Sequence, residues 1–192
     1  MEPSHPWKKQ LAMWATASRM ALAPIIMLIL VQPGEWAYWT SAVLFVLGSA
    51  TDWLDGYWAR KYNSQSVLGQ LMDPIADKIL VLGPLLMMLS IGRVDAVMVF
   101  LLISRDIFIA GIRSAAANQK IIIAAGPLGK WKTAIQMVSV TALLIYQPLL
   151  SVPVAEIGYY GLWLSVIFSL ASAAQYTWNF ARHSPSPSTR PL

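Results

Sequence analysis

The sequence predicts an all-α integral membrane protein with six transmembrane helices and both termini in the cytoplasm. Hydrophobic residues make up 57 % of the 192 residues and charged residues only 12 %, about half of the quarter that is usual in soluble domains. A soluble chain of about 150 residues buries only roughly 70 % of its surface, so its interior is too small for these side chains. Six apolar runs in series, with basic residues concentrated in the loops of one side, complete the prediction.

The first three apolar runs each reach the roughly 20 residues that a helix needs to cross the hydrocarbon core. Leu11–Val31 contains one charge, Arg19. It follows two lysines, as a secretory signal would, but it is too long and ends without a small-residue cleavage site, so we expect it to be retained. Trp36–Trp58 carries no charge in its first half, and Val67–Ile91 follows a polar loop, 61–66.

The last three runs are Val94–Ala116, Gly126–Tyr146 and Val154–Phe180. Pro148 and Pro153 separate the last two runs, because proline lacks a backbone N–H and clashes with the preceding turn of a helix. The end of the chain, 182–192, is rich in serine and proline and is predicted to be a disordered cytoplasmic tail. Residues 1–181 are therefore expected to form one six-helix membrane domain.

Basic residues predict the orientation, because Lys and Arg concentrate in the cytoplasmic loops of membrane proteins. With a cytoplasmic N-terminus, that side receives Lys8, Lys9, Arg60, Lys61, Arg113, Lys120, Lys130, Lys132, Arg182 and Arg190. The other side holds Arg93 beside Asp95, together with Glu35 and Glu156. This asymmetry predicts that both termini are cytoplasmic, and we expect the protein in the plasma membrane.

The chain has no cysteine, which excludes a disulfide framework, a thiolate metal site and a thiol nucleophile. Its net charge of +5 favours an anionic partner, either lipid headgroups or a phosphorylated substrate. Nucleic acid is not an expected partner, because the basic residues are scattered between apolar runs instead of gathering on one soluble face.

Acidic residues inside the predicted helices are candidates for function, because each costs about 2.5–3.5 kcal/mol on insertion scales. Asp52 and Asp55 lie about 60° apart around the second helix and share a face. Asp73 and Asp77 lie about 40° apart around the third helix and share a face too. Both pairs are about 10 Å from the loop that joins the two helices. An antiparallel hairpin is therefore expected to bring all four carboxylates together near the cytoplasmic surface.

Four converging carboxylates cannot all remain ionised without cations. With no His or Cys nearby, an all-oxygen site suits Mg²⁺, Mn²⁺ or Ca²⁺ better than Zn²⁺. Two divalent ions sharing four carboxylates would keep open positions for phosphate oxygens, as in two-metal phosphoryl chemistry. The structural alternative is a set of interhelical hydrogen bonds or ion pairs with Arg60 and Lys78.

The acids belong to a longer pattern, Asp52-x2-Asp55-Gly56-x2-Ala59-Arg60-x8-Gly69-x3-Asp73-x3-Asp77. At every fixed position it resembles the signature of the CDP-alcohol phosphatidyltransferase family, whose six membrane helices also suit a chain of this length. The resemblance implies two Mg²⁺ or Mn²⁺ ions bound by Asp52, Asp55, Asp73 and Asp77. It also implies nucleotide and diphosphate contacts by Asp52, Gly56, Ala59, Arg60 and Gly69.

The same resemblance implies a reaction. An alcohol attacks the β-phosphorus of CDP-diacylglycerol and CMP leaves, with Asp77, the last acid of the pattern, as the expected general base. The family also suggests a homodimer. The stretch Thr16-x2-Arg19-x4-Pro24 resembles the family's first helix, except that Ala12-Met13 stands where Pro-Asn is usual.

Basic residues on the fourth and fifth helices indicate the acceptor alcohol. Arg105 and Arg113 lie two turns apart, about 80° around the helix axis. Lys130 and Lys132 face nearly opposite ways, so one of them is expected in a shared pocket, and such cations favour a phosphorylated acceptor. The stretches around Arg105 and Lys130 resemble the bacterial phosphatidylglycerophosphate synthase branch of the family. That branch implies sn-glycerol 3-phosphate with its phosphate held by Arg105, Arg113 and Lys130.

Three alternatives remain at this point. The acceptor residues are less diagnostic than the aspartates, so the same chemistry with inositol phosphate, serine or phosphatidylglycerol stays open. The basic residues have a structural alternative, which is an ion pair with Asp106 for Arg105 and a headgroup anchor for Lys120 and Lys132. A divalent-cation transporter is the third, because intramembrane carboxylates also line ion pathways, although a transporter is expected to spread its acids through the depth of the bilayer.

Overall fold

The computed structural model describes the backbone of residues 6–62, 67–118, 127–149 and 151–183, and the side chains of residues 16–51, 72–117, 127–149 and 151–182. In these ranges the chain forms six helices and no strand longer than one isolated bridge. The helices are α1 (Pro6–Leu30), α2 (Glu35–Tyr62), α3 (Val67–Ser90), α4 (Ala96–Asn118), α5 (Pro127–Ile145) and α6 (Val154–His183). The six predicted helices are confirmed, with ends that shift by a few residues. Arg182 and His183, which the sequence assigned to the disordered tail, continue α6, and the rest of the predicted tail, from 184 onward, lies outside the described residues.

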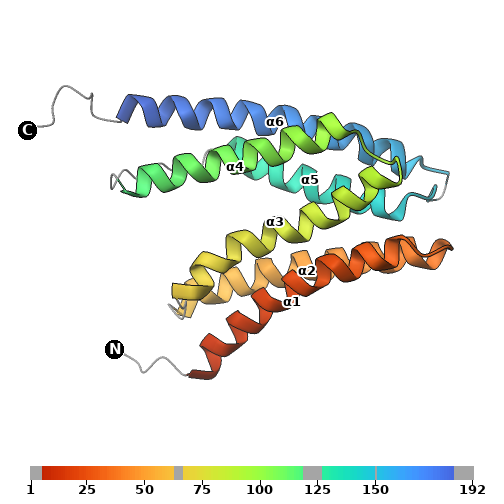
Figure 1. The fold of residues 1–192 in the computed structure, drawn as a ribbon, viewed down its shortest axis with the longest axis horizontal. Helices are drawn as coiled ribbons and strands as arrows, with labels where there is room; N and C mark the ends of the chain where they lie inside the picture. The colour runs from red at the N-terminus through yellow and green to blue at the C-terminus, as the bar shows by residue number, and fades with distance from the viewer. Residues whose placement is uncertain (1–5, 63–66, 119–126, 150, 184–192) are drawn as a thin grey trace, which may run out of the picture.

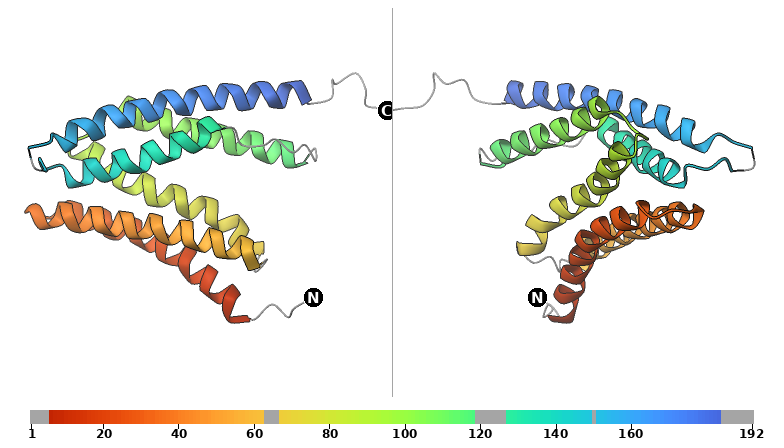
Figure 2. Two further views of the ribbon diagram at one scale, coloured as in Figure 1. Left: turned by 180° about the vertical axis from the view of Figure 1, so that it is seen from behind. Right: turned by 45° about the vertical axis from the view of Figure 1, so that its right-hand side comes forward.

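Successive helices run in opposite directions, so that the start of α1 and the end of α6 lie at the same end of the bundle (Figure 1). The helices form two groups of three, α1–α3 and α4–α6. The groups meet where α2 contacts α5 and where α3 contacts α4 and α5. They diverge toward the end at which α1 begins and α6 ends (Figure 2). The predicted metal ligands belong to the first group and the predicted acceptor residues to the second.

In the first group, α1 packs more extensively on α3 than on α2. The buried residues of α1 recur every three or four positions, as on one face of a helix: Thr16, Arg19, Ala23, Ile26 and Leu30. Gly83 brings α3 close to this face, because a Cβ at this position would lie 3.2 Å from the Cβ of Ala23. Two polar residues, Thr16 and Arg19, therefore belong to the face of α1 that packs on α3.

In the second group, α5 and α6 form the most extensive contact of the bundle. Gly158, near the start of α6, is buried against the end of α5. A Cβ at Gly158 would lie 2.9 Å from the Cβ of Ala142 and 3.0 Å from the backbone N of Leu143. Neither of these atoms can move away by a side-chain rotation, so the absence of a side chain at Gly158 is required for the observed spacing.

Gly158→Ala is expected to lower the free energy of unfolding by about 1–3 kcal/mol, because overpacking forces the two helices apart. Gly111→Ala on α4 is the matched control. A Cβ at Gly111 meets nothing within 4 Å, and alanine favours a helix over glycine by up to about 1 kcal/mol. Equilibrium unfolding in mixed detergent micelles measures the free energy of unfolding of both variants. Equal stability of the two variants would contradict this close α5–α6 packing.

At the opposite end of the bundle from the start of α1, Arg93 lies between the two groups of helices. Its guanidinium carbon is 4.2 Å from the ring centre of Tyr38 and 3.8 Å from that of Tyr146. Its Nη1 donates a hydrogen bond of 3.3 Å to the carbonyl oxygen of Leu143. Burial lowers the pKa of the Arg93 side chain, but an arginine stays charged in proteins. This contact joins the loop after α3 to α2 and to the end of α5.

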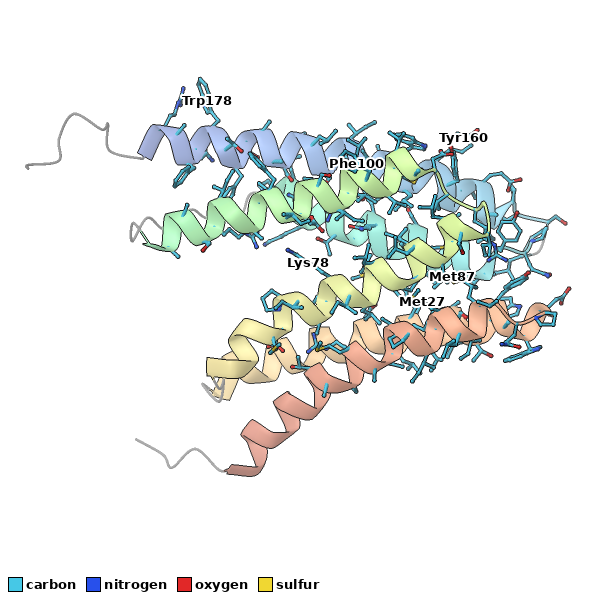
Figure 3. The ribbon with its side chains drawn as sticks, viewed as in Figure 1. Met27, Lys78, Met87, Phe100, Tyr160 and Trp178 are labelled. Atoms are coloured by element: carbon cyan, nitrogen blue, oxygen red, sulfur yellow. The ribbon has the colours of Figure 1, made fainter. Side chains whose placement is uncertain are left out.

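Large apolar side chains are exposed on every helix, among them Leu28, Leu47, Leu86, Phe100, Val138 and Ile167. Figure 3 shows Trp178 of α6 pointing away from the bundle. An apolar surface of this extent indicates contact with lipid or with another chain. Among the side chains that the structure describes, those of 154–182 in α6 make one helix that is long and apolar enough to cross a membrane, and Thr16–Leu30 of α1 forms a shorter apolar stretch.

Candidate active site

Two of the four predicted aspartates have described side chains, and both contact α1. Asp73 and Asp77 lie one turn apart on α3. The hydroxyl of Thr16 donates to Oδ1 of Asp73, and Nη1 of Arg19 donates to Oδ1 of Asp77. Nη2 of Arg19 lies 3.6 Å from Oδ1 of Asp73. One guanidinium therefore spans both carboxylates.

Burial differs across this cluster. The side chain of Arg19 is 2 % exposed, whereas those of Asp73 and Asp77 are 37 % and 40 % exposed. The arginine lies between α1 and α3, and each carboxylate is accessible beside it. A buried charge is unfavourable unless it is paired, so the two acids on the neighbouring helix offset the cost of burying this arginine.

The rest of the predicted aspartate pattern lies outside the described side chains: Asp52, Asp55, Gly56, Ala59, Arg60 and Gly69. The backbone at these positions is helical, with the first five on α2 and Gly69 on α3. Both helices that carry the pattern are therefore as predicted, and the convergence of the four carboxylates stays a prediction. The structural alternative was that the aspartates form ion pairs with Arg60 and Lys78. Asp73 and Asp77 do form ion pairs, with Arg19, whereas Lys78 donates a hydrogen bond to α4.

A second cluster of charged residues joins α4, α5 and α6. Nζ of Lys132 lies 3.0 Å from Oδ1 of Asp106, and Nη1 of Arg105 lies 3.0 Å from the same oxygen. The other nitrogens of Arg105 contact α6: Nε donates to the carbonyl oxygen of Ser169 at 3.1 Å, and Nη2 to the hydroxyl of Ser172 at 2.5 Å. The three helices are therefore connected through one carboxylate and one guanidinium.

The structure also places the remaining acceptor candidates. Lys132 is buried and Lys130 is exposed, as their spacing of two residues predicts, and the lysine inside the bundle is the one that the prediction did not select. Arg113 is exposed near the end of α4, with its guanidinium carbon 5.8 Å from the ring centre of Tyr176. Arg105 and Lys132 are brought together at Asp106, while Arg113 and Lys130 lie on the surface.

Lys78 connects the two clusters. It follows Asp77 on α3, and its Nζ donates to the carbonyl oxygen of Asp106 on α4 at 3.3 Å. Figure 3 shows Lys78 between these two helices. Because this contact joins the helix of the aspartates to the helix of Arg105, the acid pair and the cation cluster lie at a similar level of the bundle.

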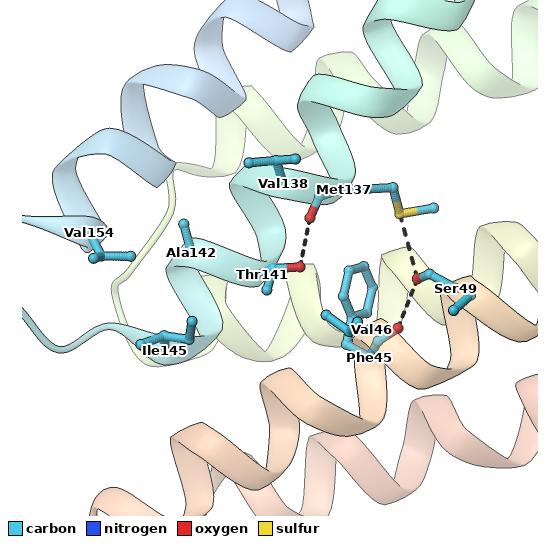
Figure 4. Close-up of a pocket in the computed structure, with 10 residues that line it drawn as sticks. Phe45, Val46, Ser49, Met137, Val138, Thr141, Ala142, Ile145 and Val154 are labelled. Carbon is cyan, nitrogen blue, oxygen red and sulfur yellow. Dashed lines mark hydrogen bonds between the residues drawn. The ribbon is translucent and has the colours of Figure 1, made fainter. Parts of the chain in front are cut away.

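An apolar cavity of about 550 Å³ lies between α2 and α5 (Figure 4). Its lining comes from Phe45, Val46, Ser49, Ala50, Met137, Val138, Thr141, Ala142, Ile145 and Val154. Ser49 faces Met137 across it, with 3.8 Å between Oγ and Sδ. No charged side chain lines the cavity. Ala50 precedes Asp52 by two residues, about 3 Å along a helix, so the cavity adjoins the part of α2 that carries the predicted ligands.

Comparison with known proteins identifies the family. The sequence model described as CDP-alcohol phosphatidyltransferase matches residues 9–171, a range that includes α2–α5, most of α1 and α6, and the charged residues of both clusters. The chain belongs to the CDP-alcohol phosphatidyltransferase family. The family that the aspartate pattern indicates is thereby confirmed.

Individual members of this family are similar over most of the chain. A protein of Bacillus subtilis (strain 168) named CDP-diacylglycerol–glycerol-3-phosphate 3-phosphatidyltransferase is 37 % identical over 176 residues, 84 % of this chain and 90 % of the relative. A protein of the same name from Rickettsia bellii (strain RML369-C) is 32 % identical over 164 residues, 85 % of this chain and 91 % of the relative. A cardiolipin synthase (CMP-forming) of Oryza sativa subsp. japonica is 34 % identical over 157 residues, 74 % of this chain and 48 % of the relative.

The described part of the site fits the divalent metal on which this family depends. Asp73 and Asp77 present carboxylate oxygens on one face of α3, more than a third of each side chain is exposed, and oxygen is the donor that Mg²⁺ and Mn²⁺ prefer. Among the described side chains, no group of three His, Cys, Asp or Glu residues could hold a metal ion. Two of the four ligands that the pattern predicts, Asp73 and Asp77, are therefore among the described side chains.

The sequence interpretation missed the role of Arg19. The sequence pattern places Arg19 in the stretch that resembles the family's first helix, but it does not predict a contact with the aspartates. A usable signal was present: Arg19 continues the three-and-four spacing of Ala23 and Ile26, which predicts that it lies on the buried face of α1. What the spacing could not show is that this face packs on α3.

Proposed function

We propose that this protein transfers the phosphatidyl group of CDP-diacylglycerol to the hydroxyl of sn-glycerol 3-phosphate, forming phosphatidylglycerophosphate and releasing CMP. The observation that carries the proposal is the complete aspartate pattern in a chain that matches two relatives of that name over more than four fifths of its length. The geometry is consistent with it, because the acid pair and a cluster of cations lie at a similar level on facing groups of helices.

We also propose that the six helices all cross the plasma membrane and that residues 1–181 form the membrane domain. The exposed apolar side chains on every helix support this. The start of α1, the end of α6 and most of the basic residues outside the helix centres occur at one end of the bundle, and Lys and Arg mark the cytoplasmic side. Both termini, the tail 182–192 and the active site are then cytoplasmic. A homodimer is proposed from the family alone.

In the proposed mechanism, the hydroxyl oxygen of glycerol 3-phosphate forms a bond to the β-phosphorus of CDP-diacylglycerol. The bond from this phosphorus to the oxygen that bridges the two phosphates breaks, and CMP leaves with that oxygen. Asp77 accepts the hydroxyl proton as general base. Asp52, Asp55, Asp73 and Asp77 would hold two Mg²⁺ or Mn²⁺ ions, which when bound polarise the diphosphate and stabilise the departing charge.

Other residues of the pattern are proposed to bind the nucleotide end of the lipid. The cation of Arg60 suits the diphosphate. Gly56, Ala59 and Gly69 have little or no side chain, which allows a ligand to approach their helices closely. The apolar cavity between α2 and α5 suits an acyl chain better than a phosphate, because no charged side chain lines it.

For the acceptor phosphate we propose three cations, Arg105 of the second cluster together with Arg113 and Lys130 on the surface. Lys132 lies beside Arg105 at Asp106. The exposure of Arg113 and Lys130 leaves both accessible to a soluble anion. The alternative is the same chemistry with inositol phosphate, serine or phosphatidylglycerol as the acceptor. Membership of a transferase family weighs against the divalent-cation transporter.

The proposal is tested by CMP release from CDP-diacylglycerol in mixed micelles with purified protein and Mg²⁺ or Mn²⁺. Glycerol 3-phosphate, inositol phosphate, serine and phosphatidylglycerol are supplied in separate reactions, with a reaction lacking any acceptor as the control. Of the four acceptors, we expect only glycerol 3-phosphate to give rapid release of CMP. No CMP should be released after chelation of the metal. Preferred use of another acceptor would replace the proposed substrate, and absence of release with all of them would contradict the transferase proposal.

A further inference from the structure

The function proposed above gives no role to Arg19, although it is the largest fully buried side chain in the described part of the protein. Its position follows from packing, because Ala23 and Ile26 on the same face of α1 are buried with it and Gly83 of α3 permits close approach. The head group of Arg19 is thereby held against the stretch of α3 that carries Asp73 and Asp77.

The contact is specific to the shape of an arginine. Its two terminal nitrogens reach two different carboxylates, Nη1 to Asp77 and Nη2 to Asp73. A guanidinium is planar and rigid and presents several donors in fixed directions, whereas a lysine offers one point of charge. The hydroxyl of Thr16, one turn earlier on α1, donates to the same oxygen of Asp73 that Arg19 approaches. Two side chains of α1 therefore contact this pair of carboxylates.

We propose that Arg19, assisted by Thr16, is a positioning residue of the transfer reaction: it holds Asp73 and Asp77 in the orientation that turnover requires, and its fixed positive charge weakens the binding of divalent cations to this acid pair. The inference rests on the proposed function for its effect on turnover. Its effect on cation binding follows from charge and distance alone.

The two parts of the proposal predict opposite changes in two measurements. Without the guanidinium, each carboxylate can rotate, and a misplacement of about 1 Å can cost a rate about 10²-fold. Loss of the positive charge, however, removes repulsion against a divalent cation at the same oxygens. In a partly solvated site this gain is expected to reach about tenfold in affinity. A variant with tighter cation binding and slower turnover is not the signature of a damaged fold.

The experiment compares Arg19→Met, Arg19→Lys and the wild-type protein. Mn²⁺ affinity is measured by electron paramagnetic resonance of the free ion, without substrates, and kcat and KM are measured at saturating Mn²⁺. Arg182→Met is the matched control, because it removes one positive charge from the exposed end of α6, where Arg182 stacks on Trp178 with 4.9 Å between its guanidinium carbon and the ring centre.

Arg19→Met is expected to bind Mn²⁺ about tenfold more tightly and to lose about 10²-fold in kcat, with KM for glycerol 3-phosphate within threefold of wild type. Arg19→Lys keeps the charge but reaches one carboxylate, so its Mn²⁺ affinity should stay within about twofold while kcat still falls about tenfold. Arg182→Met should match the wild-type protein in all measurements. Thr16→Val should lower kcat and Thr16→Ser should restore it.

Wild-type kcat in Arg19→Met, or weaker Mn²⁺ binding in a variant that unfolds at the wild-type temperature, would overturn the inference. If Arg19→Met does not fold, Arg19→Lys decides, and full turnover in that variant overturns it. Failure of the proposed function has a different signature: the wild-type protein would release no CMP from CDP-diacylglycerol, while the change in Mn²⁺ affinity would still report on Arg19.

Discussion

Asp77→Asn is expected to reduce CMP release by about 10²- to 10⁴-fold, the range over which general bases contribute, while CDP-diacylglycerol still binds. Asparagine has the shape of aspartate but cannot accept the proton of the acceptor hydroxyl. The carboxylate also pairs with Arg19 and is a proposed metal ligand, so turnover must be measured at saturating Mn²⁺, alongside direct binding of Mn²⁺ and of the lipid substrate.

Asp95→Asn is the matched control for this change. Asp95 is exposed at the opposite end of the bundle and accepts a hydrogen bond from the hydroxyl of Tyr159, far from the proposed chemistry. The Asp95→Asn variant should keep the wild-type kcat. Near-normal turnover in Asp77→Asn would contradict the assignment of the general base. Loss of lipid binding together with turnover would indicate that Asp77 acts mainly in holding the substrate.

The helices could be predicted from the sequence because each of them contains a long apolar run. An apolar run of about 20 residues has few alternatives to a helix, and proline marks an interruption between two such runs, as at Pro148 and Pro153. The predicted bounds of the third helix, 67–91, differ from those of α3 by one residue. The start of α1 and the end of α2 extend further beyond their predicted bounds. Charged residues such as Lys8 and Lys61 can continue a helix outside the apolar run that predicts it.

Partners of buried charges could not be predicted in the same way. Arg19 and Asp77 are 58 positions apart, and their contact depends on how α1 lies across α3, which is set by close packing at Gly83. The prediction paired α3 with α2, because those helices are joined by a short loop. Spacing within one helix shows which residues share a face, and it does not show which helix that face meets.

The lysine pair on α5 illustrates the same limit. Spacing required that Lys130 and Lys132 face different ways, and this is what the structure shows. Which of the two faces the interior depends on the rotation of α5 against α6, where Gly158 sets the close contact. The sequence resemblance favoured Lys130, and the helix rotation places Lys132 beside Asp106.

The two arginines of α4 are expected to respond differently to mutation, although the sequence assigned both to the acceptor phosphate. Arg113 is exposed and is available to a soluble anion. Arg113→Ala is therefore expected to raise KM for glycerol 3-phosphate about tenfold or more, since a hydrogen bond to a charged group contributes about 1.5–3 kcal/mol. Its KM for CDP-diacylglycerol and its stability should change little. Equal increases in both KM values would contradict a role in acceptor binding.

Arg105 directs all three of its nitrogens to the protein itself, to Asp106, Ser169 and Ser172. Arg105→Ala is expected to lower the free energy of unfolding by about 1–3 kcal/mol, because it leaves buried polar groups of α6 without their donor. Unfolding in mixed detergent micelles measures this loss, with Arg182→Ala as the control. A phosphate can engage Arg105 only by displacing one of these partners. A large KM effect in Arg105→Ala without a loss of stability would therefore show that the acceptor binds by such an exchange.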